Sequence, residues 1–203
     1  MINSIKKGVV DMKKTTNRVA IFFLIFVVAV VAYYAYLANK TKETKAEATM
    51  TLVQSTIDRD LVNNYPATPK EVIKYYNDII KCFYNEEATK EELQELGLVA
   101  RELYDEELLA ANELGEYSGR LQFEINDYRD NARRISGVSV ASSTDVDYFS
   151  EDGYEFARIY CSYKVSEGGA TMPVEQVYLL RRDEDKHWKI YGWDLAENVS
   201  IEE

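Results

Sequence analysis

The residues that could carry out chemistry in this chain are few and scattered. There is one histidine, His187, and there are two cysteines, Cys82 and Cys161. A catalytic histidine requires an orienting carboxylate and a nucleophile close to it. Asp183 or Asp185 could orient His187, but the sequence places no nucleophile beside them. We therefore expect His187 to be an ordinary surface side chain at the start of a strand.

Metal and cofactor motifs do not appear in the sequence. One histidine and two cysteines are too few for a zinc finger, an iron–sulfur cluster or a multi-histidine centre. The glutamates of residues 86–95 lack the alternating loop spacing of a calcium site. Gly168 and Gly169 lack the following helix and lysine of a phosphate loop, and no Gly-x-Ser-x-Gly elbow exists. The sequence thus predicts no cofactor and no metal.

Tyrosines and carboxylates leave one catalytic alternative. A carboxylate in an apolar pocket, with tyrosines to stabilise an enolate, is the arrangement of an isomerase. The chain has sixteen tyrosines, and Asp147 and Asp194 lie near apolar strand residues. Their spacing favours neither, so an enzyme remains the alternative and a non-catalytic role is the expectation.

The two cysteines are expected to be free. Cys82 lies on a predicted helix and Cys161 on the apolar side of a predicted strand. A disulfide needs an oxidising compartment and Cα atoms within about 7 Å. We expect two buried thiols that pack as small hydrophobic groups, with a disulfide as the alternative.

An uncharged apolar run at residues 19–38 predicts a transmembrane helix, since about 20 such residues cross a bilayer. The run exceeds the roughly 7–15 residues of a signal-peptide core and offers no good cleavage site, so we expect an uncleaved anchor, with a cleaved signal peptide as the alternative. Met12 is an alternative start, which would make residues 1–11 an extension.

Charge predicts the orientation of this span. Residues 1–18 carry five Lys and Arg against one Asp, whereas the rest of the chain has a net charge of −15. The positive-inside rule therefore predicts a cytoplasmic N-terminus and a single-pass cell-membrane protein with its C-terminal domain outside. The lysines of residues 40–45 oppose this assignment. The acidic balance argues against a nucleic-acid partner, because phosphates require Lys and Arg.

Beyond the span, the pattern predicts helices first and strands afterwards. Residues 39–65 predict a helical stalk or linker, residues 66–197 one α+β domain, and residues 198–203 a tail. Thr68-Pro69-Lys70-Glu71 and Thr89-Lys90-Glu91-Glu92 are helix-start signals. A short helix over 106–111 and a longer one over 116–131 follow.

The second half of the domain changes to a period of two. Strands are predicted over 135–143, 154–165, 174–182 and 188–195. The short turns between the later strands require antiparallel neighbours. The fold class is therefore α+β, with helices packed on one face of a four-stranded antiparallel sheet.

The helices, the long aromatic strand and the closing strand His187-Trp188-Lys189-Ile190-Tyr191-Gly192-Trp193 resemble the nuclear transport factor two-like, cystatin-like fold over residues 66–197. With its N-terminal span, the chain also resembles small uncharacterised membrane-anchored proteins of Gram-positive bacteria. The resemblance implies a pocket between helices and sheet, which such folds use in isomerases, dehydratases and non-catalytic binding modules.

The strand over 154–165 predicts a second aromatic face. Opposite its core side it carries Tyr154, Phe156, Arg158 and Tyr160, residue types that interfaces favour. This face is the candidate interface for a second copy of the chain or an envelope protein; coverage by the tail or a helix is the alternative. We expect a membrane-anchored extracytoplasmic binding or interaction module. An enzyme using the pocket and a structural subunit of a larger membrane complex are the alternatives.

Overall fold

The computed structural model describes residues 51–198, which belong to a compact unit that begins at Thr51. The predicted span, the segment before it, part of the linker and the end of the tail lie outside the described residues. Within residues 51–198, no helix has both the length and the apolar character that crossing a membrane requires.

Within residues 51–198, five α-helices come first and five strands follow, which confirms the α+β class. The helices are α2 (Leu52–Ile57), α3 (Pro69–Asn85), α4 (Lys90–Glu102), α5 (Glu106–Ala111) and α6 (Leu114–Asp130). The strands are β1 (Arg134–Val140), β2 (Asp147–Glu151), β3 (Tyr154–Glu167), β4 (Ala170–Arg182) and β5 (Trp188–Leu195). Two 3-10 turns, η1 (Ser143–Asp145) and η2 (Ala196–Asn198), complete the described chain.

Local signals in the sequence set where α3 and α4 begin. Thr68 and Thr89 each form a capping box. The threonine side chain accepts a hydrogen bond from the backbone N–H of the glutamate three residues later, and the side chain of that glutamate accepts one from the backbone N–H of the threonine. Pro69 occupies the first turn of α3, where its missing N–H leaves no bond unmade. Both predicted helix starts are confirmed.

The sheet is antiparallel and contains one strand more than expected. Its order is β1-β3-β4-β5, and β2 pairs with the first half of β3, while β1 pairs with the second half. The prediction of four strands missed β2, which is five residues long and almost wholly exposed, so it lacks the alternation that reveals a strand. The β3–β4 hairpin turns through Gly168 and Gly169, both at positive φ, as a tight two-residue turn requires.

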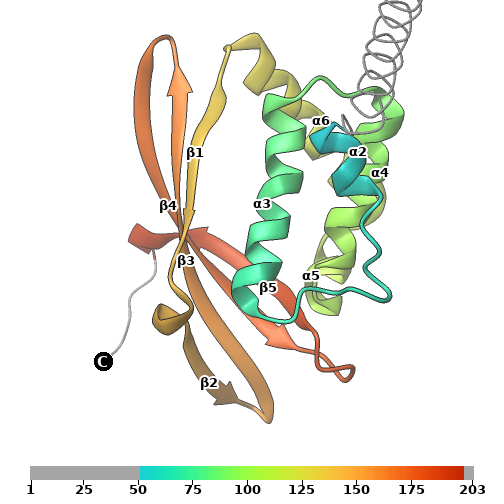
Figure 1. Cartoon of the computed structure of the whole chain (residues 1–203), viewed down its shortest axis with the longest axis vertical. Coiled ribbons are helices and arrows are strands. Elements are labelled where there is room, and N and C mark those ends of the chain that lie inside the picture. Colours follow the sequence, from blue (N-terminus) through green and yellow to red (C-terminus); the bar gives the residue numbers. More distant parts are fainter. Residues whose placement is uncertain (1–50, 199–203) are drawn as a thin grey trace, which may run out of the picture. The chain divides into compact units, whose positions relative to one another are not determined.

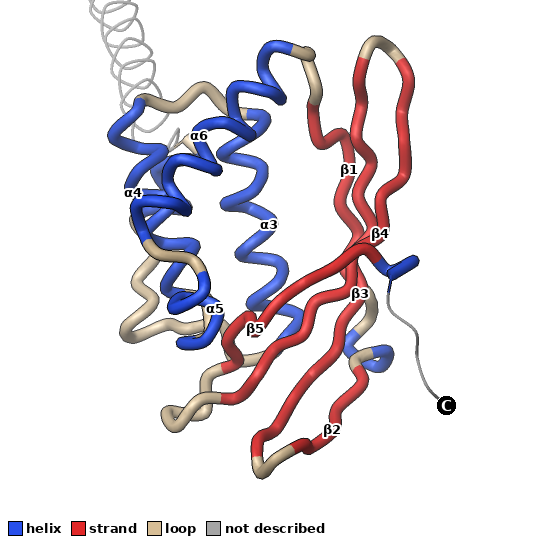
Figure 2. Tube along the Cα trace, turned by 180° about the vertical axis from the view of Figure 1, so that it is seen from behind, coloured by secondary structure: helices blue, strands red, loops and turns tan. Residues whose placement is uncertain are grey.

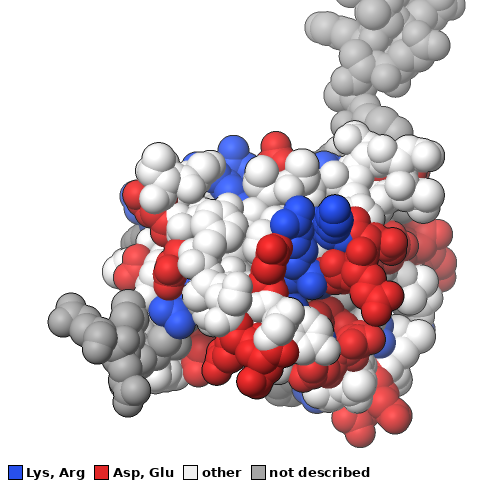
Figure 3. Space-filling view, turned by 90° about the horizontal axis from the view of Figure 1, so that it is seen from below, with Lys and Arg blue, Asp and Glu red and all other residues white. Residues whose placement is uncertain are grey.

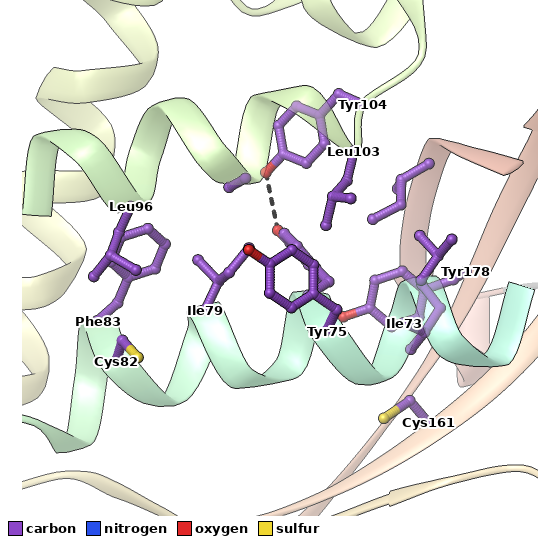
Figure 4. Packing of buried hydrophobic residues seen from close by; sticks show 14 of the residues in the cluster. Ile73, Tyr75, Ile79, Cys82, Phe83, Leu96, Leu103, Tyr104, Cys161 and Tyr178 are labelled. Atoms are coloured by element: carbon purple, nitrogen blue, oxygen red, sulfur yellow. Dashed lines mark hydrogen bonds between the residues drawn. The ribbon is translucent and has the colours of Figure 1, made fainter. Parts of the chain in front are cut away.

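All the helices of the described chain lie on one side of the sheet (Figures 1 and 2). The core fills the space between them, and it takes Ala157, Ile159 and Cys161 from the predicted inner face of β3. Helix α3 supplies the largest share of the helical side of this core and runs along the sheet (Figure 4). The opposite face of the sheet carries no helix among residues 51–198.

The compact unit begins earlier than residue 66, the expected domain boundary. Helix α2 packs against α3 and α4, and its Val53 and Thr56 side chains are buried. The Gln54 amide also donates to a carboxylate oxygen of Glu92 on α4, at 2.8 Å. Residues 51–65 are therefore part of the domain's packing rather than a free stalk.

The connection between α4 and α5 is fixed to the edge strand β5. Ile190 donates its N–H to the Leu103 carbonyl at 2.7 Å, and Asp105 donates its own to the Ile190 carbonyl at 2.8 Å. These bonds place Tyr104, which lies between Leu103 and Asp105, beside the sheet. The position of Tyr104 matters for the cavity described below.

Candidate ligand-binding site

A cavity of about 360 Å³ lies between α3, α6 and the inner face of the sheet, within the usual size range of ligand sites. We call it the tyrosine pocket. Its walls combine aromatic and aliphatic side chains with the tyrosine hydroxyls and the polar groups of Glu124 and Gln176. The lining residues are Tyr76, Ile80, Tyr84, Glu124, Tyr128, Ile135, Tyr163, Val165, Val174, Gln176, Tyr178 and Trp193.

A smaller cavity of about 130 Å³ adjoins the tyrosine pocket. The two share Tyr76, Tyr84, Glu124 and Trp193 in their linings. These four residues come from α3, α6 and β5, so three separate elements meet at the junction. A ligand in the larger cavity would touch the same side chains that separate it from the smaller one.

Buried hydrogen bonds hold the sheet side of the pocket in place. The Tyr163 hydroxyl donates to Asn77 Oδ1 at 2.7 Å, and it lies 2.6 Å from the Tyr178 hydroxyl. Tyr178 has Gln176 Oε1 as a second acceptor, at 2.9 Å. The Asn77 amide in turn donates to Cys161 Sγ at 3.4 Å. Each phenol has one proton to donate, so the hydroxyl protons of Tyr163 and Tyr178 both have protein acceptors already.

The helix side is held in the same way. The Tyr76 and Tyr104 hydroxyls lie 3.0 Å apart, the bond drawn in Figure 4. The Trp193 ring lies across this pair, with its centroid 5.9 Å from that of Tyr76 and 5.8 Å from that of Tyr104. Trp193 is 41% exposed, so its ring forms part of the rim of the pocket. Packing of rings against one another makes this wall stiff.

The electrostatics of the pocket come from neutral phenols and one carboxylate. Burial raises the pKa of Tyr76, Tyr163 and Tyr178 above its ordinary value, so these phenols are protonated at neutral pH. Glu124, on α6, is exposed at the rim and accepts a hydrogen bond from Tyr84 at 2.9 Å. No Lys, Arg or His belongs to the lining of the larger cavity.

The two carboxylates considered from the sequence lie elsewhere. Asp147 is exposed at the start of β2 and pairs with Arg158 at 3.4 Å. Asp194 is also exposed and accepts from the Asn198 amide at 2.9 Å. The pocket carboxylate, Glu124, was missed although a signal for it existed. It lies between Leu121 and Tyr128 at helical spacing on α6, where an apolar residue would be expected.

His187 lies in a different region, on the lining of a separate depression. Figure 3, a view from below, shows acidic side chains gathered around basic ones on one face of the domain. His187 stacks on Tyr65 at 4.3 Å, and the depression that it lines is open and has a volume of about 810 Å³. Two cations of that depression are already engaged: Arg181 pairs with Asp105 at 2.6 Å, and Lys189 donates to the Glu102 carbonyl at 2.7 Å. In residues 51–198, no three His, Cys, Asp or Glu side chains converge to hold a metal ion. We therefore regard the tyrosine pocket as the better candidate, despite its smaller volume.

Tyr154, Phe156, Arg158 and Tyr160 alternate along β3 with the core residues of the strand and so lie on its other side. At the start of β3 this side is not clear of the helices, because Tyr154 lines the same depression as Asp105 and Glu106. Their exposure differs: Tyr154 is 49% exposed and Phe156 only 8%. Phe156 is covered by neighbouring strands, since Phe149 stacks on it at 5.5 Å and the ring of β5 residue Tyr191 meets its edge at 5.6 Å. Part of the aromatic surface of this face is thus already buried by contacts within the sheet.

Both cysteines are free and buried. Cys82 Sγ lies 3.7 Å from Thr56 Oγ1, and Figure 4 shows it near one end of α3, well separated from Cys161. Burial raises the pKa of the Cys82 thiol to about 11. Neither sulfur lines the tyrosine pocket, so neither is placed to act as a nucleophile there.

Fold and site together define an α+β domain with an aromatic pocket between its helices and its sheet. The chain belongs to the family described as Domain of unknown function (DUF6715), whose profile matches residues 11–193. No curated protein matches the chain. Among solved structures, it is similar to the NMR solution structure of TraH from the Gram-positive conjugative plasmid pIP501. That similarity has 16% identity over 65% of this chain and 91% of TraH, at a TM-score of 0.35, which is too low to support an inference.

Proposed function

We propose that this protein is a non-catalytic binding module that takes a small ligand into the tyrosine pocket. A single span at residues 19–38 anchors it, with the domain on the outer side of the cell membrane. The observation that carries the proposal is the pocket itself: about 360 Å³, walled by aromatic rings and joined to a second cavity. Largely apolar cavities with a few fixed polar groups are the usual form of small-molecule sites.

The character of the polar groups favours binding over catalysis. An isomerase-like mechanism would use a carboxylate enclosed in the apolar pocket as its base. The carboxylate of this pocket, Glu124, is exposed at the rim, and its partner Tyr84 already donates to it. No histidine or thiol belongs to the lining. The groups present can orient a ligand, but they do not form an acid–base pair.

One further observation supports the anchored arrangement, and another supports the fold that we propose. The family profile begins at residue 11, so it includes the apolar run as well as the domain. The placement of the pocket between one helical layer and one antiparallel sheet also agrees with the nuclear transport factor two-like arrangement that we propose for this fold. A structural subunit of a larger membrane complex would have no need of such a pocket.

Filling the pocket tests the binding role. Val174→Trp adds a large ring to a lining residue and should abolish binding of indole, a neutral aromatic probe, detected by saturation-transfer NMR. Met172→Trp adds the same ring two residues earlier on β4, outside the lining, and should leave binding intact. Equal binding of indole by both variants, or none by the wild type, would contradict the proposal.

Cysteine labelling tests the location. In a chain carrying Cys82→Ala and Cys161→Ala, the change Ser200→Cys places one thiol after the domain. It should react with a membrane-impermeant maleimide in intact cells. Labelling only after lysis would place the domain in the cytoplasm and refute the orientation.

A further inference from the structure

The tyrosine pocket has the composition of a site for a positively charged ligand. Its junction with the smaller cavity joins one carboxylate, Glu124, to the rings of Tyr76, Tyr84 and Trp193. The faces of aromatic rings carry negative potential and attract cations, tryptophan most strongly. Glu124 adds a full negative charge, and no cationic side chain belongs to the lining of the larger cavity. Arg120 lines the smaller cavity, where its guanidinium donates to Asn112 Oδ1.

The hydrogen bonds of the walls disfavour the opposite charge. An anion would need N–H or O–H donors, and the phenol protons of Tyr84, Tyr163 and Tyr178 already have protein acceptors. The donors left in the lining are chiefly the Trp193 indole, the Tyr128 hydroxyl and the Gln176 amide, which are neutral. An anion would also meet Glu124 at the rim. Residues 51–198 contain 16 Lys and Arg against 30 Asp and Glu, so the net charge of −14 repels anions and attracts cations.

One ring of the pocket wall already binds a cation. The Arg133 guanidinium lies over the Tyr128 ring, 5.1 Å from its centroid. That guanidinium is not part of the lining, and it is paired with Asp127 at 2.8 Å and Glu167 at 3.2 Å. The Tyr84 ring stacks on Tyr128 with centroids 4.1 Å apart, so Tyr128 is already in contact with a cation and with a second ring. Tyr128 shows that a ring of this wall attracts a cation, and the rings of Tyr76, Tyr84 and Trp193 are the ones that line the junction.

Few acceptors are available for N–H groups inside the pocket. A primary ammonium needs three acceptors, and burying it with fewer is costly. Gln176 Oε1 already accepts from Tyr178, so the main acceptor that remains is the Glu124 carboxylate at the rim, which by itself does not supply three well-placed acceptors. A quaternary ammonium has no N–H to satisfy, and its methyl groups pack against aromatic rings. The wall chemistry thus favours a quaternary over a primary amine.

We propose that the tyrosine pocket binds a small organic cation of the quaternary ammonium class, held by the Trp193 and tyrosine rings and by the Glu124 carboxylate. This inference rests on the proposed binding function and names the chemistry of its ligand. The positive centre lies at the junction of the two cavities, and the remainder of the ligand occupies the larger one.

The test compares two probes of nearly the same shape. Choline carries a trimethylammonium group, and 3,3-dimethylbutan-1-ol replaces its nitrogen with carbon and is neutral. Affinity for the full chain is measured by saturation-transfer NMR in a nonionic maltoside detergent, because zwitterionic detergents often contain a quaternary ammonium themselves. Choline should bind at least threefold more tightly than the neutral alcohol, the lower range of a cation–π contribution.

Matched variants measure how much the Glu124 charge and the Trp193 ring each contribute to choline affinity. Glu124→Gln should weaken choline binding about two- to fivefold, as expected for a charge at an exposed rim, and leave the alcohol unaffected. Glu116→Gln removes the same charge from α6 outside the pocket and should have no effect. Trp193→Leu should weaken choline binding roughly three- to thirtyfold. Near-ultraviolet circular dichroism checks that each variant is folded.

The outcomes separate this inference from the proposed function. Equal affinity for choline and the alcohol overturns the cation proposal, and so does the same choline affinity for the Glu124 and Glu116 variants. If indole still binds in these cases, the proposed binding function stands. Absence of choline binding overturns it as well. Loss of indole binding in the wild type would overturn both. The comparison of the two probes needs no variant, so it decides the matter even if Trp193→Leu does not fold.

Discussion

Replacing Arg181 by methionine should destabilise the domain more than any surface change. The guanidinium is 5% exposed and makes a double hydrogen bond to Asp105, itself 4% exposed, at 2.9 and 2.6 Å. It also donates to Glu107 at 2.6 Å and lies between the Tyr154 and Tyr191 rings. Methionine keeps the apolar stem but leaves the Asp105 carboxylate buried without its cation.

The expected cost is about 3–5 kcal/mol, the usual effect of removing one partner of a buried ion pair. For a domain of this size, each kcal/mol lowers the melting temperature by roughly 2–4 °C, so the expected drop is about 6–20 °C. Asp105 joins the α4–α5 connection to β5 through its backbone, next to Tyr104. Losing the ion pair of Asp105 should therefore also loosen Tyr104 and the helix side of the tyrosine pocket. Thermal and urea unfolding followed by circular dichroism measure the change.

Two controls make the reasoning testable. Glu155→Gln breaks the exposed Arg182–Glu155 pair, whose atoms lie 2.7 Å apart, and should cost less than about 1 kcal/mol. The double variant Arg181→Met/Asp105→Asn should be more stable than the sum of the single effects predicts, since no charge remains buried alone and asparagine can still cap α5. An Arg181→Met protein within about 1 kcal/mol of the wild type would refute the argument.

Four further outcomes are expected. The free energy of unfolding should fall steeply above pH 10, by about 1.4 kcal/mol per pH unit for each phenol whose pKa is raised by burial. The reason is that only the unfolded chain releases those protons. Phenolate absorbance should therefore rise together with the loss of near-ultraviolet circular dichroism, not before it. Thr68→Ala removes a capping box and should cost about 1 kcal/mol in urea unfolding, against less than about 0.5 kcal/mol for Thr144→Ala in an exposed turn. Cys82 and Cys161 should resist iodoacetamide until the protein unfolds, and rapid native alkylation would contradict their burial. If the outer face of the sheet binds a second copy, Tyr160→Ala should weaken self-association about tenfold or more in light scattering, whereas a monomer at every concentration would remove that role.

Local rules were enough to predict most of the elements. A capping box needs only residues within one turn, so Thr68 and Thr89 marked two helix starts directly. The period of two along β3 assigned Ile159 and Cys161 to the inner face, because side chains alternate strictly along a strand. Gly168 and Gly169 marked the hairpin, since their positive φ angles suit glycine best. The order of helices and strands then limited the fold class to α+β.

Elements defined by long-range packing could not be recognised in this way. Strand β2 exists because it pairs with the first half of β3, and its own residues are too exposed to alternate. Helix α2 resembled a stalk in composition, and only its position against α3 and α4 buries Val53. In both cases the partner that gives the segment its structure lies far away in the sequence.

The same difference between local and long-range information applies to the candidate site. The sequence by itself determined that tyrosines are abundant, that the domain is acidic and that a helix follows over 116–131. Tertiary structure alone decided which of these groups meet: Tyr76 from α3, Glu124 from α6, Tyr178 from β4 and Trp193 from β5 line one cavity. A helix or strand fixes which side of itself a residue occupies, but the angle and depth at which layers pack fix what that side faces.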